Sequence, residues 1–494
     1  MSVSDTPVTN RHRKLAPLAK LAFASGSLEE AMVGAAGIAT MLFYNQVLGV
    51  SAALCGTAFL IASIIDAVSD PLVGALSDSV RTRWGRRHPF MFLSALPLAI
   101  SFYCLYQPPD LSELGLFVWF TVFFVTLRIA KTFYTVPHAA LGAELTDDYD
   151  ERTSIFAWNW VVANVASIVL TAFVLIVIFP TTDEHANGLL NPDRYSLLAL
   201  MGSVFIAVVV LFCTFATADQ IPYLHQTVQT LPERAGAKVR KFYRDVFANL
   251  SSLVKNRSYV SMFTCWLVLS ITGGIKAVVV TYAFIYAFEF TTEEITLQQV
   301  VRIPGALLGV AVSLWLTQKL DKKYSVIVLC YTAAFLVGLP FCLRLLGWLP
   351  DNGSVWLLVA FFGIWTIGYI PFQSVAIVID SCLTDIADEH ELNTGNRAEG
   401  MIFSIRTFGT KMTQGMGGLF GGFGLAIIGF PDNASTTTIE PGVIDGLLFM
   451  IGPLYWIIVF GGLGLAFLYN IDRQRHTEIL RQLEARRAGE LESD

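Results

Sequence analysis

Long apolar runs recur along almost the whole of this 494-residue chain and constrain its fold more than any other feature. Each run has roughly 18 to 28 mostly apolar residues, enough for a helix to cross a hydrocarbon layer of about 30 Å. With 54% hydrophobic and 15% charged residues, the chain has too much apolar surface for a water-soluble globule. The sequence therefore predicts an all-α membrane protein with twelve transmembrane helices, near 21–48, 52–77, 90–107, 115–143, 154–179, 195–217, 259–289, 298–318, 324–346, 354–381, 400–430 and 443–470.

The distribution of Lys and Arg predicts the orientation of these helices. If the N-terminus is cytoplasmic, the segments on that side carry 25 of the 33 Lys and Arg residues, whereas the loops on the other side carry only Arg194. Cytoplasmic loops of membrane proteins show this excess of positive charge. We therefore expect both termini in the cytoplasm and a multi-pass protein of the bacterial inner membrane. The net charge of −6 averages over two compartments and indicates no nucleic-acid partner.

A long hydrophilic stretch divides six predicted spans from six, which resembles the layout of the major facilitator fold, whose halves rock about a site near the bilayer midplane. The end of the chain has helical spacing of Arg, Glu and Leu and predicts an amphipathic helix. The expected domains are a cytoplasmic N-terminus at 1–20, a six-helix bundle at 21–217, a cytoplasmic central loop at 218–258, a second six-helix bundle at 259–470 and a cytoplasmic amphipathic tail at 471–494.

Two carboxylates in the second predicted span point most directly to function. Asp66 and Asp70 lie four residues apart in an otherwise apolar segment, so a helix places both on one face. An ionisable group at membrane depth is costly and marks a functional site by default. A hard cation such as Na⁺ prefers several oxygen ligands, which these acids and the Ser69 hydroxyl could supply. A static ion-pair network that joins the two halves is the alternative.

The same span continues into a tight basic loop. An acid at the helix end, followed by arginines around a glycine, would let helix ends lock together by ion pairs on the cytoplasmic side. Alternatively, these arginines only set the topology. The residues expected in this cytoplasmic gate are Asp78, Arg83, Arg86, Arg87, Glu151 and Arg152.

These motifs resemble those of a known family. The blocks are Asp66-x-x-x-Asp70-Pro71-x-x-Gly74 with Thr82-Arg83-Trp84-Gly85-Arg86-Arg87-x-Pro89, the stretch from Tyr134 through Pro137 and Glu144 to Thr153, and Asn396-Arg397-x-Glu399-Gly400 running to Lys411. They are similar to the glycoside-pentoside-hexuronide:cation symporters of the major facilitator superfamily. The resemblance covers essentially the whole chain.

The resemblance implies specific roles for several residues. Asp66 and Asp70 would hold the coupling ion, Na⁺ or H⁺, together with a hydroxyl from the fourth span, here Thr132. Lys411 would sense the occupancy of that cation site. Glu30, or Glu29 after a one-residue slip, falls where the family's sugar carriers have a sugar-binding acid, although both glutamates could instead be hydrated at the cytoplasmic end of the first span.

The chain departs from the family's sugar-binding pattern at other positions. Thr135 stands in place of a second acid, and Trp160, with Trp158 beside it, in place of an arginine. The loss of two charged groups removes hydroxyl grips that discriminate sugars. The tryptophans could stack on a sugar ring, line an apolar tunnel or simply pack against lipid. Lys276 follows two glycines and could meet an anionic head group, whereas Arg302 is expected to snorkel near a span end.

These observations favour a secondary active transporter, the Na⁺- or H⁺-coupled symport of a glycoside-like or amphipathic solute by alternating access. A sodium-coupled lysophospholipid transporter is the alternative. A membrane enzyme is not expected, because the sequence has no clustered His, Cys or Ser–base pair. No cofactor is expected besides the coupling ion. A receptor or scaffold on the same fold remains the third class. The expected partners are a small-molecule or lysolipid substrate and membrane lipids, and the protein is expected to be a monomer.

Overall fold

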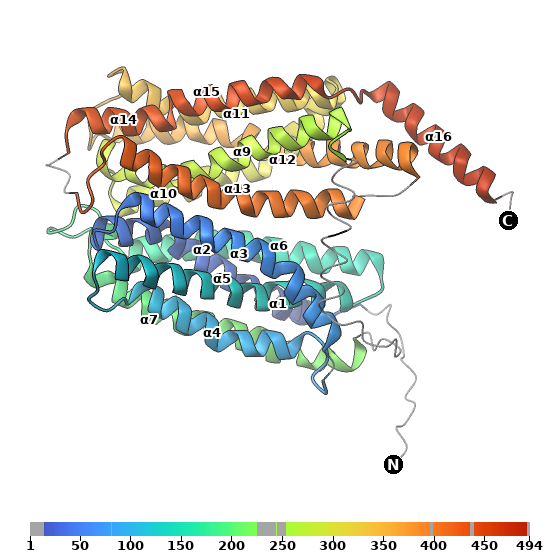
Figure 1. Ribbon diagram of the computed structural model, residues 1–494, viewed down its shortest axis with the longest axis horizontal. Helices are drawn as coiled ribbons and strands as arrows, with labels where there is room; N and C mark the ends of the chain where they lie inside the picture. Colours follow the sequence, from blue (N-terminus) through green and yellow to red (C-terminus); the bar gives the residue numbers. More distant parts are fainter. Residues whose placement is uncertain are drawn as a thin grey trace, which may run out of the picture. The chain divides into compact units, whose positions relative to one another are not determined.

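The computed structural model describes residues 14–80, 82–224, 244, 253–395, 399–434 and 439–491 (Figure 1). Within these ranges, all regular elements are helices, apart from one isolated bridge between Thr82 and Gly85. The all-α prediction is therefore confirmed. Ten of the described helices are long and apolar enough to cross a membrane.

The other two predicted spans are also helical, but neither is a single, uniformly apolar helix. The first is divided into α1 (Pro17–Ala24) and α2 (Ser27–Leu42) around Gly26, where an added Cβ would lie 2.6 Å from the Tyr134 hydroxyl. The other is α13 (Glu399–Ile427), whose many glycines lower its hydropathy. Close packing explains these glycines, since a Cβ on Gly417 would lie 2.5 Å from the Gly274 Cα.

The chain forms two compact units. The first comprises Met1–Val50 and Ile61–Phe242, and the second comprises Ser51–Leu60 and Tyr243–Asp494. Besides α1 and α2, the first contains most of α3 (Ala52–Ser79), α4 (His88–Tyr106), α5 (Glu113–Glu144), α6 (Tyr149–Phe173) and α7 (Asp193–Ala216). Besides α13, the second contains α9 (Arg257–Tyr282), α10 (Thr292–Lys319), α11 (Lys322–Leu345), α12 (Val355–Thr394), α14 (Pro441–Ile451), α15 (Pro453–Leu463) and α16 (Arg473–Leu491).

The last predicted span is interrupted. It consists of α14 and α15, which meet at Gly452 and Pro453. Proline cannot donate a backbone hydrogen bond, so the helix breaks there. A side chain on Gly452 would collide with the Cys342 sulfur at 2.8 Å, which accounts for the glycine at this bend.

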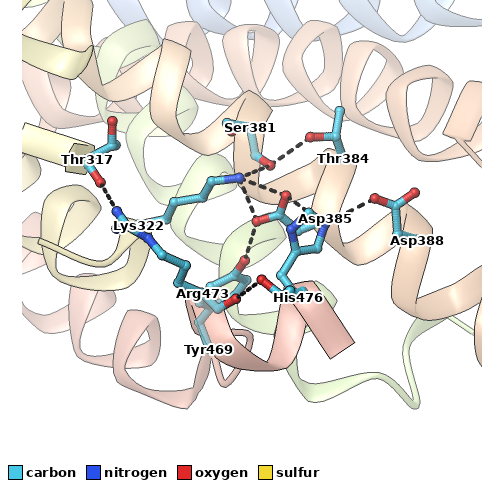
Figure 2. Close-up of polar contacts among 10 residues, drawn as sticks. Thr317, Lys322, Ser381, Thr384, Asp385, Asp388, Tyr469, Arg473 and His476 are labelled. Carbon is cyan, nitrogen blue, oxygen red and sulfur yellow. Dashed lines mark hydrogen bonds and ion pairs between the residues drawn. The ribbon is translucent and has the colours of Figure 1, made fainter. Parts of the chain in front are cut away.

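Helix α16 packs against the rest of the second unit through charged contacts and through its buried Ile479 and Leu483. Figure 2 shows Lys322, Tyr469 and His476 pointing toward the buried carboxylate of Asp385 on α12. Lys322 Nζ lies 2.7 Å from both Asp385 oxygens, and His476 Nε2 lies 3.4 Å from Asp385 and 3.1 Å from Asp388. Burial raises the pKa of Tyr469, whose hydroxyl faces Asp385. One carboxylate therefore joins α11, α12 and the segment that leads into α16.

Candidate functional site

The carboxylates of Asp66 and Asp70 on α3 share one hydroxyl from α5. Thr132 Oγ1 lies 3.2 Å from Asp66 Oδ1 and 3.2 Å from Asp70 Oδ1. The Ser69 hydroxyl lies 3.2 Å from the same Thr132 oxygen and 3.0 Å from the Asp66 carbonyl oxygen. Asp66, Ser69 and Thr132 are all buried. The first unit therefore gathers two carboxylates and two hydroxyls at one point.

These groups come together for simple geometric reasons. The four-residue spacing in α3 stacks the two acids on one face, with Ser69 beside them. Thr132 lies mid-way along α5, whose first turn is capped by the Ser112 side chain. Among the described residues, no group of three or more His, Cys, Asp or Glu side chains could hold a metal ion. An ion at this place must therefore draw on hydroxyl and backbone oxygens as well as on the two acids.

A basic side chain, that of Arg128, faces these carboxylates. Arg128, one turn before Thr132 on α5, lies with Nη1 3.6 Å from Asp66 Oδ2, and its guanidinium stacks over the Phe124 ring at 5.1 Å. The contact involves the Asp66 oxygen that Thr132 does not bind. Arg128 thus balances part of the negative charge of Asp66. Its contact does not involve Oδ1, the Asp66 oxygen that lies on the side of Thr132 and Asp70.

The two glutamates of the first predicted span have opposite environments. Glu30 is exposed and pairs with Lys131 at 2.8 Å. Glu29 is fully buried, and neither of its carboxylate oxygens has a hydrogen-bond partner among the residues that the structure describes. Adjacent residues of a helix point in different directions, so only Glu30 presents its charge to an accessible surface.

The remaining predicted substrate residues of the first unit do not form one cluster with Glu30 in the described contacts. Thr135 on α5 is half-buried, one residue after the buried Tyr134. Trp158 and Trp160 on α6 expose 38% and 60% of their surface. Both tryptophans are therefore accessible to lipid or to a solute.

The predicted gate residues divide into two groups. Arg87 lies 2.6 Å from Asp78 and 2.8 Å from Glu144, and Arg86 lies 3.0 Å from the same Glu144 oxygen. This cluster joins the ends of α3, α4 and α5. Arg83 lies exposed in the tight loop that precedes α4.

The second group lies at the start of α6. Glu151 accepts a hydrogen bond from the Leu15 backbone and pairs with Lys20 at 2.9 Å. Arg152 contacts the Thr146 carbonyl oxygen at 3.1 Å and lies 3.9 Å from Asp147. Glu151 therefore ties α6 to α1, whereas Glu144 is the carboxylate that binds both loop arginines, Arg86 and Arg87.

The second unit contains Lys276 on α9 and Lys411 on α13, both half-buried. The Lys276 ammonium lies 4.7 Å from the Phe372 ring centroid and 6.0 Å from that of Tyr369. Arg302 is not near a helix end, contrary to the expectation that it snorkels. It lies in the interior of α10, with its guanidinium 5.9 Å from the Tyr369 ring.

Sequence reasoning missed three partners. It gave no carboxylate partner to Arg128 or Lys131, and it quoted Glu144 only as part of a motif. A helical projection offered one signal, because Arg128 precedes Thr132 by one turn and shares its face. The pairs themselves join helices distant in sequence, and local periodicity says nothing about such contacts.

The profile of the family described as MFS/sugar transport protein matches residues 22–473. The putative glycoside/cation symporter YagG of Escherichia coli (strain K12) is 26% identical over 91% of each chain. The sodium-dependent lysophosphatidylcholine symporter 1-A of Danio rerio is 22% identical over 98% of this chain and 91% of its own. The crystal structure of a D-xylose-proton symporter matches with a TM-score of 0.58 at 15% identity, over 92% of this chain and 96% of that chain, and shows a common fold.

Proposed function

The chain belongs to the MFS/sugar transport protein family, the glycoside-pentoside-hexuronide:cation symporters of the major facilitator superfamily, and from this premise we propose that it is a Na⁺-coupled symporter whose ion binds at Asp66 and Asp70. It is a multi-pass membrane transporter and a cation-coupled symporter, not an enzyme. We propose the identity of the ion and that of the solute from the contacts of the site residues.

The position of the Thr132 hydroxyl carries the proposal for Na⁺. It lies 3.2 Å from one oxygen of each aspartate, with Ser69 at the same distance from it. Two carboxylates this close repel each other unless a positive charge lies between them. A small hard cation fits this need, because it accepts carboxylate and hydroxyl oxygens together. Protonation of one aspartate would relieve the same repulsion, which makes H⁺ the competing ion.

Arg128 gives the site a way to respond to the ion. Its guanidinium lies on Asp66 Oδ2 and therefore competes with an ion for the same negative charge. Ion binding weakens this pair and frees Arg128, which is one route from ion occupancy to a rearrangement of α5. By thermodynamic linkage, whatever the ion does for solute affinity the solute does for ion affinity.

The solute is proposed to be a glycoside-like or amphipathic molecule that crosses the membrane together with the ion by alternating access. Glu30, Thr135, Trp158, Trp160, Lys276 and Lys411 are its proposed contacts. A lysophospholipid is the second candidate, favoured by the absence of the charged sugar grips and by the presence of Lys276 and Lys411. Location in a bacterial inner membrane with both termini in the cytoplasm, and function as a monomer, belong to the same proposal.

Thermal unfolding of the purified protein tests the ion site. The wild type is expected to gain stability in NaCl or LiCl over KCl and choline chloride of equal ionic strength, at every pH between 6 and 8. Asp66→Asn and Asp70→Asn should abolish the gain, whereas Asp110→Asn, in an exposed loop, should keep it. A wild type without a cation-specific gain would refute Na⁺ binding. Uptake driven by a pH gradient alone would then assign H⁺.

A further inference from the structure

Two basic side chains lie at the same membrane depth in the second unit. Lys276 lies about 16 Å along its helix from Ala287, and Arg302 lies about 15 Å from Thr292. A short loop connects these two helix ends, so both side chains lie well inside a hydrocarbon layer of about 30 Å. Charged groups at this depth mark substrate or ion pathways.

Neither of these side chains has an acidic partner among the described residues. The Arg302 side chain is exposed, lies 3.5 Å from Gln299 and makes a hydrogen bond with the Tyr369 hydroxyl. Three other basic groups of the helices do have acidic partners: Arg128 pairs with Asp66, Lys131 with Glu30 and Arg406 with Asp380. An unpaired charge in a region of low dielectric constant costs free energy. We therefore expect an anion beside Lys276 and Arg302, and the described residues of the protein do not provide one.

The ring of Tyr369 holds the two basic groups near each other. It is 95% buried, with Lys276 Nζ 6.0 Å and Arg302 Cζ 5.9 Å from its centroid. Phe372, one turn away on α12, offers a second ring to the ammonium at 4.7 Å. Cation–π contacts orient these cations but leave their charge uncompensated.

An apolar groove of about 900 Å³ adjoins Lys276. It is formed by α9, α13, α14 and α15 with Leu345 of α11, and of its described lining residues only Lys276 and Asp445 are charged. The apolar lining includes Ile271, Ile275, Phe420, Phe423, Phe449 and Ile427, the last of which is 82% exposed. The size is that of a pocket for a small organic molecule.

We propose that Lys276, Arg302 and Tyr369 bind an acidic head group of the transported solute, a carboxylate or a phosphate, while the groove beside Lys276 holds its apolar part. This inference rests on the proposed symport function and narrows its solute to an anionic amphiphile. A resident membrane phospholipid fits less well, because its head group lies at the bilayer surface, about 16 Å from Lys276 along the helix. A neutral glycoside would leave both cations uncompensated.

Binding measurements on the full chain in phosphatidylcholine nanodiscs test this assignment. Octyl glucuronide and octyl phosphate combine charge and tail, octyl glucoside lacks the charge, and glucuronate lacks the tail. We expect both charged amphiphiles to bind at least tenfold more tightly than octyl glucoside and than glucuronate. Equal affinities for octyl glucuronide and octyl glucoside would overturn the proposal.

Matched variants locate the two parts of the site. Lys276→Gln and Arg302→Gln should remove the preference for charge. Lys323→Gln, at a half-buried lysine that lies outside the groove and donates to the Phe467 carbonyl oxygen, should keep it. Ile427→Trp should fill the groove and weaken octyl glucuronide alone, whereas Ile457→Trp, exposed but outside the groove, should not. Octyl glucuronide binding that is unchanged in Lys276→Gln and Arg302→Gln would overturn the head-group site.

Three further outcomes identify the source of the anion and test the two proposals separately. Phosphatidylglycerol that competes with octyl glucuronide, without uptake of octyl glucuronide into proteoliposomes, would identify a resident lipid and refute the cargo. Na⁺-dependent stabilisation without any binding of the charged amphiphiles would refute this inference and leave the symport function. Lys276-dependent binding without any Na⁺ effect would refute the proposed Na⁺ coupling and leave the anion site.

Discussion

Replacement of Arg128 by Gln is expected to tighten Na⁺ binding rather than to weaken it. Arg128 lies 3.6 Å from Asp66 and contributes a positive charge to a site that is proposed to bind a cation. An ion about 2.4 Å from the Asp66 carboxylate would lie roughly 5.5 Å from this guanidinium, where like charges repel by about 3 kcal/mol at an effective dielectric constant of about 20. The Arg128 side chain is 30% exposed, so water screens part of this repulsion. About half of it, ~1.5 kcal/mol, corresponds to a tenfold change in the dissociation constant.

The assay is the Na⁺ concentration that gives half of the maximal thermal stabilisation, with choline chloride added to constant ionic strength. Arg128→Gln should reach half-stabilisation at about one tenth of the wild-type concentration. Arg128→Lys keeps the charge and should stay near the wild-type value. If Arg128→Gln needs as much Na⁺ as the wild type or more, then Arg128 positions Asp66 instead of competing with the ion, and the electrostatic reasoning is refuted.

Three other substitutions test the contacts around the site by thermal unfolding and proteolysis. Glu144→Gln should destabilise the protein by about 3 kcal/mol, because the half-buried Arg86 loses its carboxylate and the buried Arg87 keeps only Asp78. The exposed Asp110→Asn should have no effect, and equal midpoints would refute the pairing. Glu29→Met should stabilise by about 1–3 kcal/mol, because it removes a buried carboxylate without partners; a lower midpoint would show that Glu29 has a partner. Asp385→Asn should speed tryptic cleavage within α16 more than Asp388→Asn does, because Asp385 binds both Lys322 and His476, whereas the ion pair of Asp388 is with His476. Identical cleavage rates in the two variants would exclude Asp385 as the anchor of α16.

Several features of this protein follow from the sequence alone. Apolar runs of membrane-spanning length predict the helices, because backbone groups in a bilayer must be satisfied within the helix itself. The spacing of Asp66 and Asp70 predicts one acidic face, because helical periodicity is a local property. The tail from residue 471 was predicted as a helix, and α16 begins at Arg473.

Tertiary structure decided which charges meet. The sequence analysis expected ion pairs between the acid at the helix end, Asp78, and the loop arginines, and left Glu144 within a motif. Arg87 does bind Asp78, and Glu144 in addition receives both Arg86 and Arg87. It expected Arg302 near a span end, but α10 begins earlier, at Thr292, and this places Arg302 deep in the helix beside Tyr369. Such contacts depend on how each helix is rotated and packed against helices far away in the chain. The periodicity of one helix fixes which of its residues share a face, and only packing fixes what that face meets.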